Sequence, residues 1–96
     1  MRVISPKALR EFASRHADAG TALDTWYRVA KAAAWKNILE LRTTWPSAEA
    51  VGELTVFNIK GNAYRLIARV LYRAQIIYVC AVLTHAEYDK ENWKKR

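Results

Sequence analysis

The sequence predicts an α+β fold in which an antiparallel sheet carries two N-terminal helices on one of its faces. In the first half of the chain, apolar residues recur at the spacing of amphipathic helices. In the second half the period changes to the alternation typical of strands, and the pair Gly61-Asn62 separates two apolar runs as a hairpin would. The length of 96 residues fits a single domain over residues 1–96.

The chain begins with a strand and a helix. Residues 2–4 suit one short strand, at an edge or in the centre of a sheet. Ser5 as N-cap and Pro6 at the first helical position then predict a helix from Lys7 to about His16. The pair Ala19-Gly20 ends this helix.

A second helix and two shorter elements follow. With Thr21 or Asp24 as its cap, the helix runs to about Ala34 and pairs with the first as a helical hairpin. Residues 37–44 suit a short helical turn, and residues 46–50 suit a turn or a further short helix opened by proline.

The second half contains the sheet. Three strands are predicted at about Leu54–Lys60, Ala63–Arg73 and Ile76–Thr84. Gly61-Asn62 joins the first two as a two-residue hairpin, because both residues tolerate positive φ. Residues 86–96 are polar and predict a short helix or a frayed tail.

Composition limits the function classes. The formal net charge is 16 − 9 = +7 and the pI is about 9.9, which favours a polyanionic partner: nucleic acid first, an acidic protein second and a membrane surface third. A basic protein without such a partner is the alternative. The single cysteine, Cys80, excludes an intramolecular disulfide and a thiolate metal cluster.

Targeting and cofactor signals are missing from the sequence. No uncharged apolar run approaches the ~20 residues of a membrane helix, and residues 1–5 do not resemble a signal peptide. We therefore expect a cytoplasmic protein. Two distant histidines give no zinc signature, and no glycine-rich loop could cradle a phosphate, so we expect neither a metal nor a cofactor.

Three arginines are expected on one face of the middle strand. Arg65, Arg69 and Arg73 share one strand face, and successive positions on that face, including the apolar ones between, lie roughly 6.5–7 Å apart, close to the phosphate spacing of single-stranded RNA. Arginine also offers a planar fork that matches phosphate. The row is predicted to bind an RNA backbone, and the alternative is a solvated sheet face.

The hairpin adds two polar side chains to this row. If Gly61-Asn62 is the loop, Lys60 pairs with Ala63 and Asn58 pairs with Arg65. Asn58, Lys60 and Arg65 are then expected to face the same way. Such a group could hold one phosphate and neutralise charge that develops in a transition state.

The segment after the third strand contains the candidate acid and base groups. Histidine exchanges protons near neutral pH, which suits His85 to general acid or base chemistry. If the segment is helical, His85, Tyr88 and Asp89 share one face. An ordinary exposed histidine is the alternative for His85, and His16, at the end of the first helix, is expected to complement the helix dipole without catalysis.

Four tryptophans could stack on bases. Trp26, Trp35 and Trp45 fall at apolar positions of the helical half and are expected in the core. Trp93 lies in the charged tail and is the exception.

Several segments together resemble the HigB family of type II toxins. They are Met1-Arg2-Val3-Ile4-Ser5, Ala8-Leu9-Arg10-Glu11-Phe12, Trp35-Lys36-Asn37, Pro46-Ser47-Ala48, Val56-Phe57-Asn58-Ile59, Gly61-Asn62, Tyr64-Arg65-Leu66-Ile67 and Thr84-His85-Ala86-Glu87-Tyr88-Asp89-Lys90. The last two segments are the most specific.

The resemblance implies a RelE-like fold and an mRNA interferase that commonly acts on messenger RNA within the ribosome. It also implies neutralisation by a HigA antitoxin, which is a helix-turn-helix protein. Cleavage in RelE-like enzymes is metal-free: the RNA 2′-hydroxyl attacks the adjacent phosphate, giving a 2′,3′-cyclic phosphate and a 5′-hydroxyl end.

The resemblance also implies roles for single residues. Arg65 matches the phosphate-binding arginine of the central strand, and Lys60 matches a basic residue before the hairpin that stabilises the charged transition state. His85 stands where RelE has an arginine, and Asn58 stands where RelE has a second lysine. Tyr88 and Asp89 resemble aromatic and acidic residues near the C-terminus of other members.

The leading interpretation is a toxin endoribonuclease in which Lys60, Arg65, His85 and Tyr88 form the catalytic group. Binding of RNA is assigned to five basic or amide side chains: Lys36, Asn58, Arg69, Arg73 and Lys90. Lys31 and the tail Lys94-Lys95-Arg96 are expected to add affinity for RNA or ribosome. A non-catalytic basic module that binds RNA or an antitoxin helix is the second interpretation. A DNA-binding partner of a repressor is the third.

Overall fold

The computed structural model of the chain describes residues 1–90 and 92–95 and has an α+β architecture. The elements in chain order are β1 (Arg2–Ile4), α1 (Lys7–Arg15), the 3-10 helix η1 (Ala17–Ala19), α2 (Gly20–Ala32), α3 (Ile38–Thr44), β2 (Glu49–Val51), β3 (Leu54–Ile59), β4 (Tyr64–Leu71), β5 (Ile76–Thr84), α4 (His85–Asp89) and the 3-10 helix η2 (Asn92–Lys95).

The sheet has the strand order β1-β5-β4-β3-β2. The three predicted strands are confirmed and pair antiparallel. The sheet is antiparallel as predicted except at one edge, where β1 pairs parallel with β5, so the sheet as a whole is mixed. Between β1 and the next strand in the chain, β2, lie α1, η1, α2 and α3, and β2 is at the opposite edge of the sheet. The strand β1 is therefore joined to its neighbour β5 only through most of the chain.

The segment around residue 50 also differs from its prediction as a turn or helix. Residues 49–51 form the edge strand β2, which pairs with the start of β3. Gly52 makes the tight return between the two strands with a φ of 60°, in the left-handed region that favours glycine.

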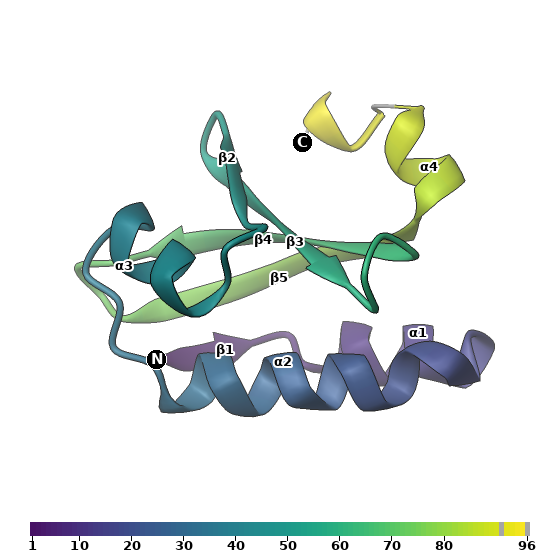
Figure 1. Cartoon of the computed structure of the whole chain (residues 1–96), viewed down its shortest axis with the longest axis horizontal. Coiled ribbons are helices and arrows are strands. Elements are labelled where there is room, and N and C mark those ends of the chain that lie inside the picture. The colour runs from purple at the N-terminus through teal and green to yellow at the C-terminus, as the bar shows by residue number, and fades with distance from the viewer. Residues whose placement is uncertain (91, 96) are drawn as a thin grey trace.

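Helices α1 and α2 cover one face of the sheet, as predicted, and Figure 1 shows them together below it. Between the two layers lies a core that contains Phe12, Trp26, Phe57 and Leu66, each at most 2% exposed. The predicted cap of α1 is wrong. Ser5 has a φ of 67°, and Pro6 takes the N-cap position without a capping hydrogen bond from a side chain.

Two short helices at the C-terminal end cover part of the opposite face. Figure 1 shows α4 and η2 on the side of the sheet away from α1 and α2. Trp93 of η2 packs there on Leu54, Val56 and Ile67 and is only 5% exposed. The expectation that Trp93 stands outside the core is therefore wrong, whereas Trp26 and Trp35 are buried as predicted.

The structure also bears on the predictions for the segment at 37–44, for a membrane helix and for a metal site. The segment at 37–44 is the predicted short helix, and the Asn37 side chain caps it by accepting a hydrogen bond from the Glu40 amide (2.9 Å). No helix among the described residues is long and apolar enough to cross a membrane. Within residues 1–90 and 92–95, no three His, Cys, Asp or Glu side chains gather where a metal ion could bind. Arg96, part of the predicted basic tail, lies outside the described residues.

Candidate functional site

The β3–β4 hairpin has the predicted register. Asn58 pairs with Arg65 and Ile59 with Tyr64, and the Ala63 amide donates to the Lys60 carbonyl (3.2 Å). The positive φ angles fall on Lys60 (53°) and Gly61 (63°), whereas Gly61 and Asn62 were expected to take them. Side chains along a strand point to alternate faces of the sheet only while the backbone stays extended. Because Lys60 has a positive φ, its side chain does not follow this alternation.

Lys60 therefore points to the helical side of the sheet. Its Nζ lies 2.9 Å from Asp18 Oδ2, and the Tyr64 hydroxyl donates to Asp18 Oδ1 (2.7 Å). Tyr64 belongs to the core under α1 and α2. The prediction that Lys60 faces the same way as Asn58 and Arg65 is wrong.

This contact between η1 and the hairpin perturbs two groups. The hydrogen bond from Lys60, followed by the one from Tyr64, holds the pKa of Asp18 below its ordinary value. The same carboxylate raises the pKa of Tyr64, because it accepts a hydrogen bond from the neutral phenol and would repel the phenolate. The His16 ring stacks on Phe12 at 4.4 Å and lies 5.6 Å from the Tyr64 ring, so it belongs to this packing.

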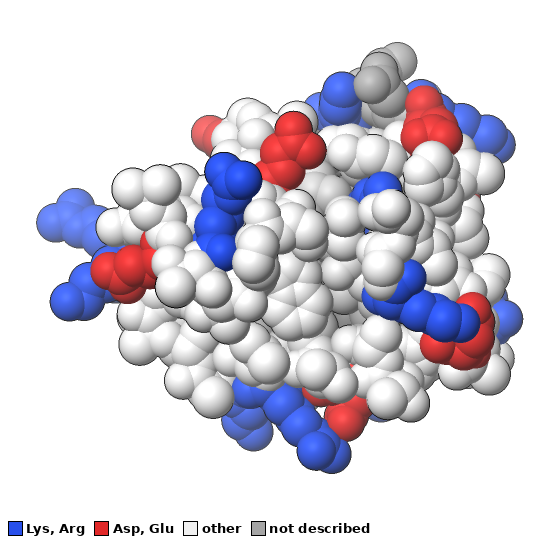
Figure 2. Space-filling view, viewed as in Figure 1, with Lys and Arg blue, Asp and Glu red and all other residues white. Residues whose placement is uncertain are grey.

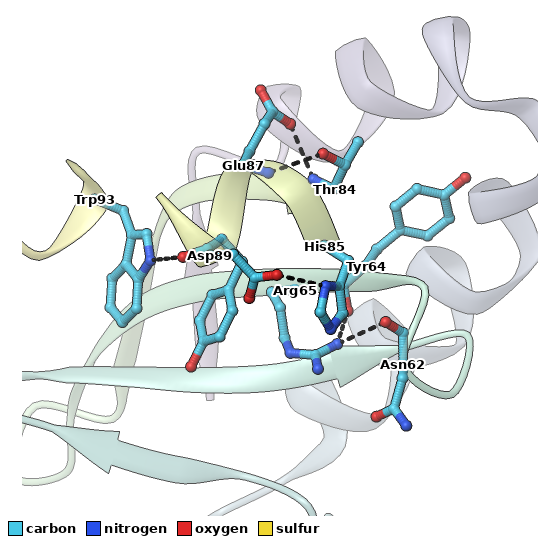
Figure 3. Close-up of polar contacts among 9 residues, drawn as sticks. Asn62, Tyr64, Arg65, Thr84, His85, Glu87, Asp89 and Trp93 are labelled. Carbon is cyan, nitrogen blue, oxygen red and sulfur yellow. Dashed lines mark hydrogen bonds and ion pairs between the residues drawn. The ribbon is translucent and has the colours of Figure 1, made fainter. Parts of the chain in front are cut away.

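Arg65 lies on the opposite face of β4, and its guanidinium has three neighbours. Nη1 donates to the carbonyls of Asn62 (3.0 Å) and Tyr64 (3.1 Å), and Cζ lies 5.2 Å from the centroid of the Tyr88 ring. Figure 3 shows the guanidinium next to the hairpin end, beneath α4. The side chain is half-buried, so a fixed positive charge remains open to an anionic ligand.

Helix α4 begins at a capping box that fixes the position of His85. The Glu87 amide donates to Thr84 Oγ1 (3.2 Å), and the Thr84 amide donates to Glu87 Oε1 (2.9 Å). The hydrogen bond from the Thr84 amide is the main reason that the pKa of Glu87 is lowered. The motif Thr-x-x-Glu is readable in the sequence, but its role was not recognised there.

The helical turn brings His85 and Asp89 together as predicted, with 3.0 Å between His85 Nδ1 and Asp89 Oδ2. Both side chains are exposed. A carboxylate at Nδ1 orients the imidazole and leaves Nε2 for a substrate. Because the Arg65 guanidinium contacts Tyr88 of the same helix, the imidazole and the guanidinium lie on the same side of the sheet, as Figure 3 shows.

Tyr88 joins this site to the hydrophobic packing of the C-terminal end. Its ring stacks on Trp93 with centroids 5.0 Å apart and planes at 14°, and Trp93 Nε1 donates to the Tyr88 carbonyl (2.9 Å). The buried indole thus holds the phenol ring against Arg65. We call Arg65, His85, Tyr88 and Asp89 the Arg65–His85 cluster.

The predicted RNA-binding residues are spread over the sheet. Asn58 lies beside Arg65 in register and donates to the Asn62 side chain (3.2 Å), and Lys90 directly follows α4. Arg69 is about 13 Å from Arg65 along β4, and its Nη2 is 3.5 Å from Glu53 Oε2.

Two of these residues lie far from the cluster. Arg73 lies beyond the end of β4, so the regular row has two arginines rather than three. Lys36 follows Trp35, whose carbonyl accepts from Gln75 in the β4–β5 turn (2.8 Å). The ends of β4 are roughly 23 Å apart, so neither Arg73 nor Lys36 reaches the Arg65–His85 cluster.

The lysines and arginines are spread over the surface rather than gathered in one place. Figure 2, in the view of Figure 1, shows Lys and Arg scattered over the visible side of the molecule, several of them next to acidic side chains.

Comparison with known proteins bears on the activity of the chain. The profile of the family HigB_toxin, described as the RelE-like toxic component of a toxin-antitoxin system, matches residues 19–91. The mRNA interferase toxin HigB of Escherichia coli strain K12 is 32% identical to the chain over 92 residues, covering 93% of the chain and 88% of that protein. The mRNA interferase HigB of Shigella flexneri gives the same values. That of Escherichia coli O6:H1 is 30% identical over 93 residues, covering 94% of the chain and 90% of that protein.

Proposed function

Since the chain belongs to the HigB family of RelE-like toxins, we propose that it cleaves messenger RNA at the Arg65–His85 cluster. It is the toxic component of a toxin–antitoxin system and an mRNA interferase, that is, an endoribonuclease. The location of its active site and the chemistry at that site are the substance of the proposal.

The observation that carries the proposal is the placement of a fixed guanidinium beneath a helix that presents an oriented imidazole. Arg65 is held by two carbonyls and the Tyr88 ring, and His85 is held by Asp89. A phosphodiester needs positive charge at its non-bridging oxygens and a base near its 2′-hydroxyl, and the cluster has both.

In the proposed reaction, His85 Nε2 takes the proton of the RNA 2′-hydroxyl. The 2′-oxygen then forms a bond to the adjacent phosphorus while the bond from phosphorus to the 5′-oxygen breaks. Arg65 neutralises the charge that develops on the phosphoryl oxygens, and the departing 5′-oxygen takes a proton from water at the exposed site. The hydroxide left by that water takes the proton held by His85, which restores the neutral imidazole. The products are a 2′,3′-cyclic phosphate and a 5′-hydroxyl end, without a metal ion.

Tyr88 is proposed to act through Arg65. Its ring lies between the guanidinium and Trp93, which suits support of the arginine better than proton transfer. Lys60 is not part of the proposed catalytic group, because Asp18 engages its ammonium on the other side of the sheet. Asn58, Arg69 and Lys90 are proposed to contact the RNA on either side of the reacting phosphate, and Lys36 and Arg73 to contact it at a distance.

The partners extend the proposal. We infer that the messenger RNA is cleaved on cytoplasmic ribosomes and that a HigA-type helix-turn-helix antitoxin neutralises the toxin. The net charge of +7 supports the first of these partners, since ribosomal and messenger RNA are polyanionic. Binding to RNA should then weaken steeply with salt, as counterion release requires.

The test compares purified wild-type protein, His85→Ala and Arg65→Ala on messenger RNA presented free and on translating ribosomes. We expect cleavage to fall about 10²–10⁴-fold without the histidine and about 10²–10³-fold without the arginine, and the wild-type products to have the stated ends. Arg28→Ala is the control, because it removes one exposed arginine from α2, whose partner is Asp24.

Equal cleavage by wild type and both cluster variants would refute the site. Growth arrest that persists in cells expressing His85→Ala would indicate a toxin that blocks translation by binding instead of cleavage.

A further inference from the structure

A hollow of about 250 Å³ borders Trp93, whose ring stacks on Tyr88 of the Arg65–His85 cluster, and the hollow has no role in the reaction proposed above. Its walls come from the turn between β2 and β3, from η2 and from β4, and they include Gly52, Glu53, Leu54, Arg69 and Trp93. In Figure 1 the β2–β3 turn and η2 both stand on the side of the sheet that carries α4. The hollow therefore opens on the face where the RNA would lie.

The size of the hollow limits its occupant. Pockets for drug-sized ligands measure about 300–1,000 Å³, so this one suits a single planar ring system rather than a dinucleotide. Leu54 and the indole of Trp93 line the hollow, but they are only 7% and 5% exposed, so they offer a base a narrow apolar strip to pack against rather than an open ring face. Lys94, the remaining basic residue of the wall, places its Nζ 5.7 Å from the Trp93 ring centroid.

The polar groups of the wall favour a base over a phosphate. Glu53 is 84% exposed, and its carboxylate lies 3.5 Å from Arg69 Nη2. A carboxylate repels a phosphate but accepts hydrogen bonds from the amino groups of cytosine, adenine or guanine. Uracil has no amino group. Its one donor on that edge, N3–H, lies between two carbonyl oxygens that repel a carboxylate, so uracil should bind less well. Arg69 and Lys94 can neutralise the phosphates on either side of the base.

The distance between the hollow and the Arg65–His85 cluster determines which nucleotide of the RNA reaches the hollow. Arg69 is four residues from Arg65 on the same face of β4, about 13 Å away, which is two steps of the phosphate spacing. A second hollow of about 580 Å³ shares Gly52, Glu53, Leu54 and Arg69 and continues to Asn37 at the start of α3. An RNA strand that passes the first hollow thus has an open path toward Lys36.

We propose that the hollow between the β2–β3 turn and η2 binds one amino-bearing nucleobase, two nucleotides from the scissile phosphate, through the carboxylate of Glu53. This inference rests on the proposed function, and it adds a base preference that the Arg65–His85 cluster alone does not contain. Arg69 has two partners in it: Glu53 in the empty protein and an RNA phosphate in the complex.

The experiment uses messages that differ only in the base at each position around one cleavage point, presented free and on ribosomes. For the wild type we expect cleavage to be about tenfold or more faster with cytosine, adenine or guanine than with uracil at the position two nucleotides away. Glu53→Ala should reduce this preference to within about twofold, chiefly by slowing cleavage of the messages with an amino-bearing base. Glu49→Gln, an exposed glutamate on β2, is the control and should keep the preference.

Binding provides a second readout. Glu53→Ala releases Arg69 from its ion pair, so affinity for an all-uracil RNA should rise, with a salt slope steeper by about one phosphate contact. A wild-type preference that is missing at that position, or one that survives Glu53→Ala, would overturn the inference and leave the proposed function intact. Failure of the wild type to cleave any message in either presentation would overturn both.

Discussion

The contact between Tyr88 and Arg65 offers a direct test of how the site is held. Tyr88→Leu removes the ring that touches the guanidinium at 5.2 Å and stacks on Trp93 at 5.0 Å. Tyr88→Phe keeps both ring contacts and removes only the hydroxyl. If the ring supports the arginine, the leucine variant should lose activity and the phenylalanine variant should not.

The size of the effect follows from the two contacts. An aromatic pair contributes about 0.5–1.5 kcal/mol beyond its buried area, and a cation–π contact at an exposed site about 0.5–1 kcal/mol. Tyr88→Leu should therefore lower the free energy of unfolding by about 1–2.5 kcal/mol. The arginine's share converts to a loss of about two- to fivefold in kcat/KM, at about 1.36 kcal/mol for each factor of ten.

The assay combines urea unfolding with cleavage kinetics at a urea concentration and temperature where every variant is folded. Tyr27→Leu is the matched control, because Tyr27 is a half-buried tyrosine with Lys31 Nζ 5.8 Å from its ring, on the helical side of the molecule. It should lose stability without losing activity. A loss of about 10² or more in Tyr88→Phe would make the hydroxyl a proton donor and refute the supporting role, as would full activity in Tyr88→Leu.

Three further predictions concern the surroundings of the site. Thr84→Val removes the cap of α4 and should cost about 0.5–2 kcal/mol in urea unfolding, with slower cleavage because His85 begins that helix; unchanged kinetics would separate the cap from the site. In the folded state the pKa of Asp18 is lowered and the pKa of Tyr64 is raised, so their contact stabilises the fold between about pH 4 and about pH 10. This stabilisation is lost as the pH falls through the folded pKa of Asp18 or rises through that of Tyr64. The melting temperature should therefore depend less on pH at the acid end in Asp18→Asn and at the alkaline end in Tyr64→Phe. Lys60→Ala should reduce cleavage much less than Arg65→Ala, because Lys60 is bound to Asp18 on the helical side; an equal loss in single-turnover assays would return it to the catalytic group.

Much of the fold could be read from the sequence because local patterns determine it. Apolar spacing predicted α1 and α2, and alternation together with Gly61-Asn62 predicted the register of the hairpin, including the pair Asn58 and Arg65. The strand β2 was missed because its three residues carry no alternation and depend on pairing with β3.

The errors at the site have a common physical origin, which is contact between distant parts of the chain. Lys60 leaves the pattern of its strand because its backbone is left-handed and because Asp18, 42 residues away, binds its ammonium. Trp93 is one aromatic residue in a charged segment, and its burial depends on the sheet face formed by Leu54, Val56 and Ile67. His85 and Asp89 were paired correctly because their spacing of four residues is a local property of a helix.

The two halves of the proposed active site therefore differ in how firmly they are held. Arg65 lies on β4, which pairs on both sides with β3 and β5, so its backbone moves only if the sheet opens. His85 lies on a helix of five residues, too short to be stable alone. Its position depends on the Thr84 cap, the Tyr88 ring and the burial of Trp93. Local unfolding of α4 and η2 would separate the imidazole from the guanidinium while the sheet stays folded. The C-terminal packing is therefore as much a condition for cleavage as the catalytic groups.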